Sequence, residues 1–213
     1  FTHWGKQFWQ FAGGYLSPRR SIKPLLFFLL IVAMTLVSVR ISLVHSEWYN
    51  NMYTSLQEFN EPVFWDQMVL FCVIATSSVI AALLSYYLEQ RFSIDWIEWL
   101  NGQLVDKWMA NRAYYKTQYV SANLDNPDQR IQQDVQSYVR TTLSLSTGVI
   151  DAVTSMISYT ILLWGLAGPM IVFGTEIPRM MVFLVFAYVI ITTAIAFRLG
   201  RPLIMLNFVN ERL

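Results

Sequence analysis

The chain has 213 residues, of which 55% are hydrophobic and 14% are charged, and its formal net charge at pH 7 is +1. A soluble domain rarely combines so much apolar sequence with so few charges, so this composition excludes an ordinary soluble enzyme or binding module. The 15 Lys and Arg residues are spread along the chain rather than gathered in one basic segment, so nucleic-acid binding has no support.

The first predicted elements cover residues 1–63. Residues 1–20 are rich in aromatic side chains, which favour the headgroup layer, and we interpret them as an elbow helix lying along the cytoplasmic membrane interface. The alternative is the tail of an earlier membrane span. Transmembrane helix 1 is predicted at residues 21–46, and an outer segment follows at 47–63. Three aromatic residues of that segment predict an interfacial belt or, alternatively, a gate or ligand site: Trp48, Tyr49 and Tyr53.

The second predicted membrane helix, residues 64–113, does not stop where its apolar run stops at Leu88. Beyond that residue, apolar side chains continue at a helical spacing of three and four: Ile94, Ile97, Leu100, Leu104 and Trp108. At 1.5 Å per residue the whole helix is roughly 70 Å long, so we expect it to project well into the cytoplasm. Its amphipathic extension needs partners, because one helix cannot bury its own apolar stripe. The polar residues 114–126 are predicted to form a cytoplasmic turn.

Two further membrane helices are predicted at residues 127–165, with a cytoplasmic extension, and at 179–213, joined by a short outer loop at 166–178. Each of the four apolar runs is close to the roughly 20 residues that cross a bilayer core as a helix. The runs lack the alternation of a membrane barrel, so the sequence predicts an all-α polytopic membrane protein. The chain starts without Met or a cationic leader and ends in helix-forming sequence, so we expect no signal peptide and a cut at each end.

Lys and Arg are unevenly distributed among the segments that flank the apolar runs. Thirteen lie before the first run, between the second and third, or after the fourth, whereas only Arg40 and Arg179 lie in the other two segments. Because positive residues concentrate on the cytoplasmic side, we predict that the N-terminal end, the middle segment and the C-terminal end are cytoplasmic.

The middle segment ends in a polar sequence, Asn126-Pro-Asp-Gln-Arg-Ile-Gln-Gln-Asp134, with the features of a helix start. Asn126 suits the N-cap, Pro127 suits the first helical position, and the Asp that follows favours the positive end of the helix dipole. Gln129 stands three residues after the cap, as in a capping box, and Arg130 and Asp134 have the i,i+4 spacing of a pair. On spacing alone, these residues predict a well-capped cytoplasmic helix, with or without a role in coupling.

Asp151 is the only acidic residue well inside an apolar run. Counted from residue 143 at 1.5 Å per residue, it is predicted to lie roughly 12 Å within the membrane. An ionised carboxylate that faces lipid costs roughly a few kcal/mol, so this side chain is expected to face a cavity or a partner. Two functional alternatives follow: lining a hydrated solute cavity, or taking up protons.

No other set of residues supports catalysis or metal binding. Cys72 is the only cysteine, which excludes a disulfide or a thiol-based metal site within one chain, and His3 and His45 lack ligand-like spacing. The chain has no nucleophile–base set and no G-x-x-x-x-G-K-[ST] motif to hold ATP phosphates. We therefore expect no metal, no bound cofactor and no enzymatic activity in the chain itself.

The polar sequence from Asn126 to Asp134, preceded by Arg112-Ala-Tyr-Tyr115, resembles the membrane domain of the SbmA/BacA-like branch of ABC transporters. This branch is related to the peroxisomal fatty-acyl ABC transporters, and the nearest likeness within it is to the mycobacterial BacA-like multisolute transporters. Further matches occur in the same order along almost the whole chain: Trp4-Gly-Lys-Gln-Phe-Trp9, Asn51-Met-Tyr-Thr54, Ile161-Leu-Leu-Trp164, Ile177-Pro-Arg179 and Gly200-Arg-Pro-Leu-Ile204.

The resemblance implies the first four transmembrane helices of a type IV, exporter-like membrane domain, which forms a homodimer around a central cavity in a bacterial plasma (inner) membrane. In this family the turn between helices 2 and 3 touches the ATPase domain, and it maps here to the candidate coupling residues Asn126, Pro127, Asp128, Gln129, Arg130 and Asp134. The chain contains neither helices 5 and 6 nor an ATPase domain, so ATP and Mg²⁺ are expected on a domain of the same chain or a partner chain. Related solutes are hydrophilic compounds that are taken up: antimicrobial peptides, bleomycin-like compounds and cobalamin.

The predicted function is therefore that of the membrane domain of an ATP-coupled translocase that takes up hydrophilic solutes across the bilayer. Three alternatives stand beside it. An SbmA-like, proton-driven peptide transporter without an ATPase domain would be favoured by uptake that an uncoupler abolishes and vanadate does not. A fatty-acyl or lipid transporter would be favoured by an apolar cavity wall. A membrane scaffold without transport activity would be favoured if cysteines placed near Asp151 did not react with probes from water.

Overall fold

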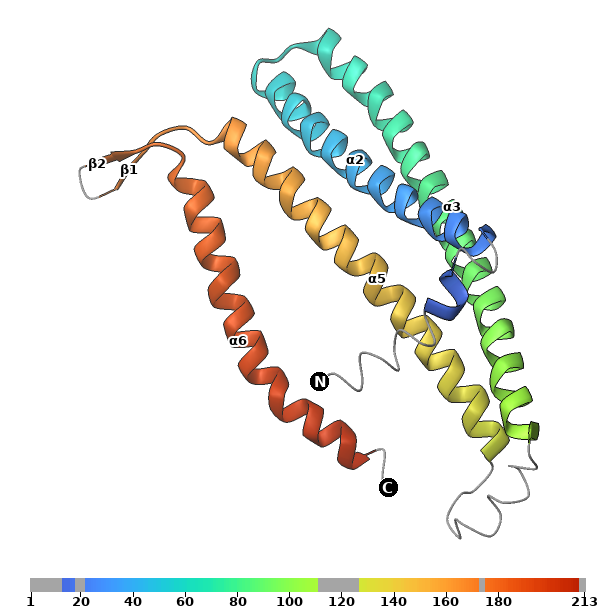
Figure 1. The fold of residues 1–213 in the computed structure, drawn as a ribbon. Helices are drawn as coiled ribbons and strands as arrows, with labels where there is room; N and C mark the ends of the chain where they lie inside the picture. Colours follow the sequence, from blue (N-terminus) through green and yellow to red (C-terminus); the bar gives the residue numbers. More distant parts are fainter. Residues whose placement is uncertain (1–12, 18–21, 111–126, 173–174, 211–213) are drawn as a thin grey trace. The chain divides into compact units, whose positions relative to one another are not determined.

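The computed structural model describes residues 13–17, 22–110, 127–172 and 175–210. Four long helices dominate it (Figure 1): α2 (Lys23–Gln57), α3 (Glu61–Met109), α5 (Pro127–Leu166) and α6 (Met180–Asn210). All four are long and apolar enough to cross a membrane, judged by length and composition. The prediction of an all-α membrane protein with four long apolar helices is therefore confirmed. The chain forms two compact units, Phe1–Ser155 and Met156–Leu213, and each is described by itself.

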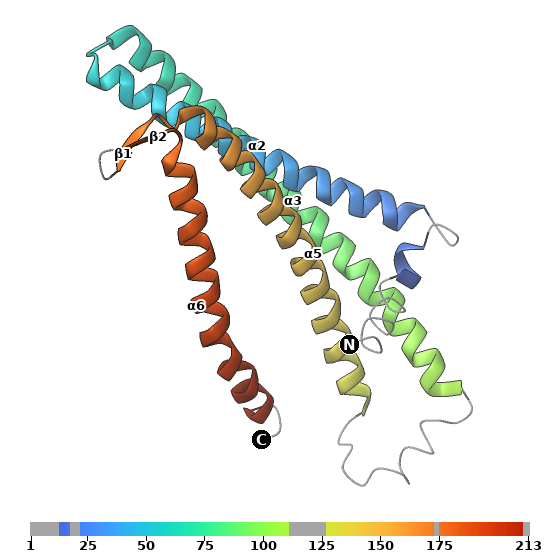
Figure 2. The ribbon, with the colours of Figure 1, turned by 60° about the vertical axis from the view of Figure 1, so that its left-hand side comes forward.

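In the first unit, α2 and α3 form an antiparallel pair that runs side by side (Figures 1 and 2). Their 35 and 49 residues correspond to lengths of about 52 and 73 Å at 1.5 Å per residue, so each exceeds a bilayer core of about 30 Å. Hydroxyl groups along α2 donate to carbonyls one turn back, for example Ser38 Oγ to the Met34 oxygen at 3.1 Å. The serine and threonine hydroxyl groups of this helix are thus satisfied by its own backbone, which makes them acceptable in an apolar environment.

The turn between α2 and α3 is a Schellman motif. The Phe59 amide donates to the Leu56 carbonyl at 3.3 Å and the Asn60 amide donates to the Ser55 carbonyl at 3.0 Å, while Phe59 takes a left-handed φ of 51°. Asn60 then caps α3 by accepting the Val63 amide on Oδ1 at 3.4 Å. Glycine is the residue that usually fills the left-handed position, so Phe59 is held there against its own preference.

Replacing Phe59 with glycine is therefore expected to stabilise the α2–α3 turn by up to about 1 kcal/mol, because glycine has no Cβ to oppose the left-handed conformation. Thermal unfolding of the purified protein in detergent measures the gain. Phe59→Ala is the matched control, since alanine also removes the exposed ring but retains the Cβ. An alanine variant as stable as the glycine variant would contradict this explanation.

Helix α2 continues through residues 47–57, so the boundary predicted at residue 46 is not the end of the helix. The continuation is physically reasonable because this stretch contains neither Pro nor Gly and packs against α3. The Trp48 Nε1 group donates to the Gln67 carbonyl at 2.8 Å, and the Trp48 ring lies 4.9 Å from that of Phe71, measured between centroids.

The core of the first unit lies where α2, α3 and α5 approach each other, near the ends of α3 and α5 that residues 111–126 join; we call this the connector end. Its buried apolar residues are Ile31, Leu88, Phe92, Trp96, Leu100, Val135, Val139 and Leu143. On α3 and α5 these side chains recur at a spacing of four, which places them on one face of each helix. The partly buried Tyr15 and Leu16, from a short helical turn at residues 13–16, pack against the same core.

The second unit contains the end of α5, a two-stranded antiparallel hairpin and α6. Strands β1 (Met170–Val172) and β2 (Thr175–Ile177) pair Ile171 with Glu176, a feature that the predicted outer loop did not include. The Arg179 guanidinium lies 4.5 Å from the centroid of the Trp164 ring, which ties the start of α6 to the end of α5 through a cation–π contact.

Candidate functional site

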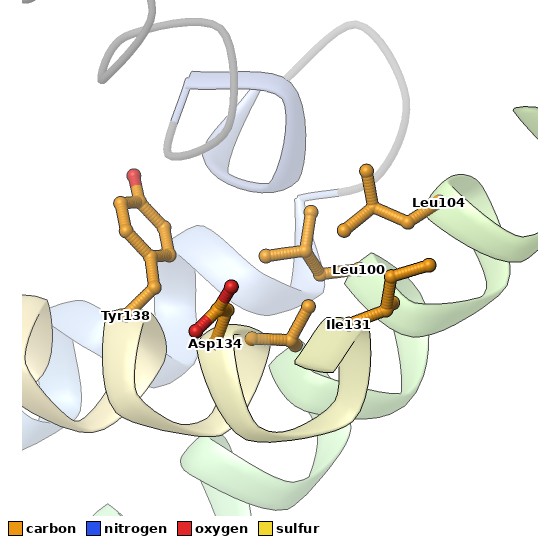
Figure 3. Close-up of a pocket in the computed structure, with 6 residues that line it drawn as sticks. Leu100, Leu104, Ile131, Asp134 and Tyr138 are labelled. Carbon is orange, nitrogen blue, oxygen red and sulfur yellow. The ribbon is translucent and has the colours of Figure 1, made fainter. Parts of the chain in front are cut away.

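A groove lies between α3 and α5 at the connector end (Figure 3). Its volume is about 240 Å³, and its lining residues are Leu100, Leu104, Ile131, Asp134, Val135 and Tyr138. The floor is aliphatic, whereas the Asp134 carboxylate and the Tyr138 hydroxyl both come from α5 and form a polar edge (Figure 3). The groove is therefore an amphipathic surface next to the residues that join the two helices.

Beneath the groove, α3 and α5 meet through buried apolar side chains. Trp96, Leu100, Val135 and Val139 are each no more than 3% exposed. The Tyr138 ring also meets the Trp96 ring edge-on, with 6.2 Å between centroids. Because these side chains share one buried cluster, the connector ends of the two helices are expected to move together.

Aromatic rings join the turn at residues 13–16 and α2 to the same cluster. The Tyr15 ring stacks on Trp96 with 5.6 Å between centroids and an interplanar angle of 4°, and it meets the Phe92 ring at 5.7 Å. Phe27 from α2 packs against the same cluster, with 6.1 Å between the centroids of its ring and that of Phe92. A Cβ at Gly14 would lie only 3.1 Å from Trp99, so this close approach favours a glycine. We call the assembly of the turn, α2, α3 and α5 around Trp96 the aromatic base.

The Tyr15 hydroxyl provides a pH test of this docking. Burial raises the pKa of Tyr15 from 10.0 to about 12, and the nearby Asp95 carboxylate adds to the increase. Because the folded-state pKa lies above that of a free tyrosine, the stability that Tyr15 contributes is present below pH 10 and is lost as the pH rises through about 12.

The absorbance difference at 295 nm between the parent protein and Tyr15→Phe should therefore titrate with a midpoint near 12. An undocked ring would instead give a midpoint near the ordinary value of 10.0. That result would show that the turn at residues 13–16 does not rest on Trp96 in solution.

The structure places the predicted coupling residues at the connector end only in part. Asn126, the predicted N-cap, lies outside the described residues, and α5 begins at Pro127. Asp128, Gln129 and Arg130 follow in the first turn of the helix, and the Gln129 side chain is exposed. Asp134 lies one turn further, at the edge of the groove. The capping pair and the Arg130–Asp134 pair stay predictions.

Asp151 is exposed on α5, and among the described residues it takes part in no ion pair. It belongs to a face of α5 that is polar or small at every position for six helical turns. This polar face consists of Gln133, Ser137, Arg140, Thr141, Ser144, Gly148, Asp151 and Ser155, which follow one another in steps of three or four except for the adjacent Arg140 and Thr141. At 1.5 Å per residue it is about 33 Å long, and its part from Ser144 onward lies beyond residue 143, where the membrane-crossing part of α5 is predicted to begin.

The outer aromatic residues separate into two roles. Trp48 holds α2 to α3 through its hydrogen bond to the Gln67 carbonyl, so this residue has a structural role. Tyr49 and Tyr53 instead form an exposed pair, with 4.9 Å between ring centroids. A gate or ligand role for these two residues stays a prediction.

Sequence comparisons bear on these features. A family described as "ABC transporter transmembrane region 2" matches residues 12–213. An ABC transporter ATP-binding protein of Haemophilus influenzae is 86% identical over 213 residues, which are 100% of this chain and 36% of that protein. The inner membrane ABC transporter ATP-binding protein YddA of Escherichia coli is 32% identical over 193 residues, 88% of this chain and 34% of its own length.

A plant protein extends the likeness to another group. The chloroplastic ABC transporter D family member 2 of Arabidopsis thaliana is 26% identical over 211 residues, which are 99% of this chain and 28% of that protein. The chain thus spans about a third of the length of the relatives that it matches. Those relatives also contain sequence that has no counterpart in these 213 residues.

Proposed function

Because this chain belongs to the ABC transporter transmembrane region 2 family, we propose that it is the membrane domain of an ATP-driven transporter that takes up hydrophilic solutes. The parent protein works as a homodimer in a bacterial plasma (inner) membrane, with the N- and C-terminal ends of the chain in the cytoplasm. The connector end is then the cytoplasmic end, as the distribution of Lys and Arg predicts.

The observation that carries the proposal is the aromatic base. It joins α2, α3 and α5 at the one end where residues 111–126 connect α3 to α5. A displacement applied to that connection reaches all three helices together, because the packed base does not deform gradually. ATP-driven closure of two ATPase domains would push the coupling residues, and the long helices would rock to switch access to a central cavity.

The polar face of α5 supports hydrophilic solutes rather than acyl chains. Asp151, which lies inside the predicted span, is costly against lipid and favourable against water, so this face suits the wall of a hydrated cavity. A fatty-acyl or lipid transporter would need an apolar wall instead. The SbmA/BacA-like placement is part of the proposal, because it is the branch whose solutes are hydrophilic.

The relatives favour ATP over a proton gradient as the energy source. Two of them carry "ATP-binding protein" in their names, and this chain covers only about a third of each. We propose that ATP and Mg²⁺ bind to a nucleotide-binding domain on the same chain or on a partner chain. The proton-driven alternative then requires the polypeptide to end without such a domain.

The test uses the full-length protein reconstituted in liposomes, with uptake of peptides and of cobalamin as the readout. We expect uptake to require ATP on the connector side, to stop with vanadate and to continue with an uncoupler. Uptake that stops with the uncoupler and continues with vanadate would support the proton-driven alternative. Vanadate-sensitive ATP turnover that no peptide or cobalamin stimulates, but fatty acyl-CoA does, would support the lipid alternative.

A further inference from the structure

We propose that Asp151 forms a cation-binding subsite in the membrane, which selects solutes that carry an amine or guanidinium group. The proposal rests on the proposed function in that it places Asp151 in the solute path. It goes further because it assigns the sign of the charge that the path recognises. It also assigns one carboxylate as the group that makes the selection.

The location of Asp151 is the first step. The polar face of α5 is opposite the buried face, on which Val135, Val139 and Leu143 are 3%, 0% and 6% exposed. The hydroxyl groups of the polar face do not show that it needs water or a polar partner, because serine and threonine can bond to their own helix, as they do on α2. A carboxylate has no such internal partner, since it only accepts hydrogen bonds and the helical amides are already used. Asp151 therefore needs water, a donor or a cation.

The surroundings of Asp151 are the second step. The nearest cation on the same face is Arg140, which is 11 residues and so about 16 Å away along the helix. One turn before Asp151, the Thr147 hydroxyl donates its proton to the Leu143 carbonyl at 3.0 Å, with the Ser144 carbonyl at 3.3 Å. The Thr147 oxygen is thereby left as an acceptor. The position thus offers acceptors, and no cation of α5 is nearer to it than Arg140.

The opposite side of α5 provides an internal comparison. Leu145, Val149 and Val153 lie at the same depths but are apolar, and they are 64%, 61% and 48% exposed. These residues suit lipid or helix packing, whereas the polar face does not. The helix is thus two-sided through the depth of the membrane, with the carboxylate on the side that suits water.

The experiment measures the local charge with cysteine reagents on the full-length protein in membranes. Cys72 is replaced with alanine, together with any cysteine outside these 213 residues, and a single cysteine is placed at Gly148 or at Ser155. Both positions are neighbours of Asp151 on the helix surface, at roughly 5–6 Å between Cβ atoms, and Gly148 has open space around it. The probes are the cationic thiosulfonate MTSET and the anionic thiosulfonate MTSES.

With Asp151 present, we expect both cysteines to react faster with the cationic reagent than with the anionic one. Asp151→Asn should lower this rate ratio about tenfold, the effect of one unit charge at about 6 Å on two oppositely charged reagents in water. Cysteines at Val149 and Val153 are the controls, and they should react slowly with both reagents. Spermidine should protect the Gly148→Cys protein from an uncharged maleimide, and this protection should be lost in Asp151→Asn.

Three outcomes would overturn the proposal, and they separate it from the proposed function. Fast labelling with a rate ratio that Asp151→Asn does not change would show a hydrated path without a cation subsite. Labelling without spermidine protection would show a negative field that binds no amine. Labelling no faster at Gly148 and Ser155 than at the control positions would show that the face is not hydrated. ATP dependence is measured separately, so none of these results decides the energy source.

Discussion

Replacing Trp96 with alanine is expected to destabilise the connector end by about 3–5 kcal/mol and to reduce transport much more than ATP turnover. Trp96 is 2% exposed, and its ring contacts the rings of Tyr15, Phe92 and Tyr138. Truncation of a buried tryptophan to alanine typically costs this amount, because the surrounding side chains do not close the cavity. The loss of stability would occur in the aromatic base, which joins the turn at residues 13–16, α3 and α5. Thermal unfolding in detergent gives the stability, and vesicle uptake per ATP hydrolysed gives the coupling.

Trp96→Phe is the matched control for this prediction. The indole Nε1 group of Trp96 is buried and has no hydrogen-bond partner among the residues that the structure describes, so removing it breaks no hydrogen bond there. Phenylalanine retains an aromatic ring for Tyr15 to stack on, and we expect a loss of only about 1 kcal/mol with coupling retained. If Trp96→Ala lost no more stability than Trp96→Phe, or if it remained fully coupled, the aromatic base would not be the part that transmits the movement.

The sequence predicted the helices well because their signals are local. Each apolar run approaches or exceeds the length that a bilayer requires, and the stripe from Ile94 to Trp108 indicates that α3 continues beyond its apolar run. The end of α2 was harder to predict from the sequence. Residues 47–57 are polar enough to resemble a loop, but their helix is held by a contact with α3, from Trp48 to the carbonyl of Gln67. A contact of that kind has no local pattern.

The site was predictable only in its individual residues. Asp151 is visible in the sequence because one carboxylate in an apolar run is costly, whereas the polar face around it consists of ordinary residues such as Ser137 and Gly148. The face becomes apparent only when the buried side of α5 is known. The aromatic base depends on Tyr15 meeting Trp96, about 80 residues later in the chain, and no periodicity predicts such a pairing. The groove beside Asp134 follows from that packing.

Replacing Arg130 and Asp134 together with alanine is expected to lower transport per ATP about tenfold while ATP turnover persists, a loss within the range of typical coupling free energies. An i,i+4 ion pair on a helix surface contributes only about 0.2–0.5 kcal/mol, so the double variant should remain folded. A large loss of coupling would therefore not result from unfolding of the protein. Gln132→Ala is the control, because Gln132 is exposed on the same helical turn.

A charge exchange distinguishes the two ways in which this pair could act. Arg130→Asp combined with Asp134→Arg restores an ion pair within the helix but reverses the charges that α5 presents at the groove. If the pair serves only to stiffen the first turns of α5, the exchange should restore coupling. If Asp134 meets a complementary group of the ATPase domain, the exchange should be as defective as the double alanine variant. Full coupling in the double alanine variant would contradict both, and the push would then have to enter through other residues, such as those at 111–129.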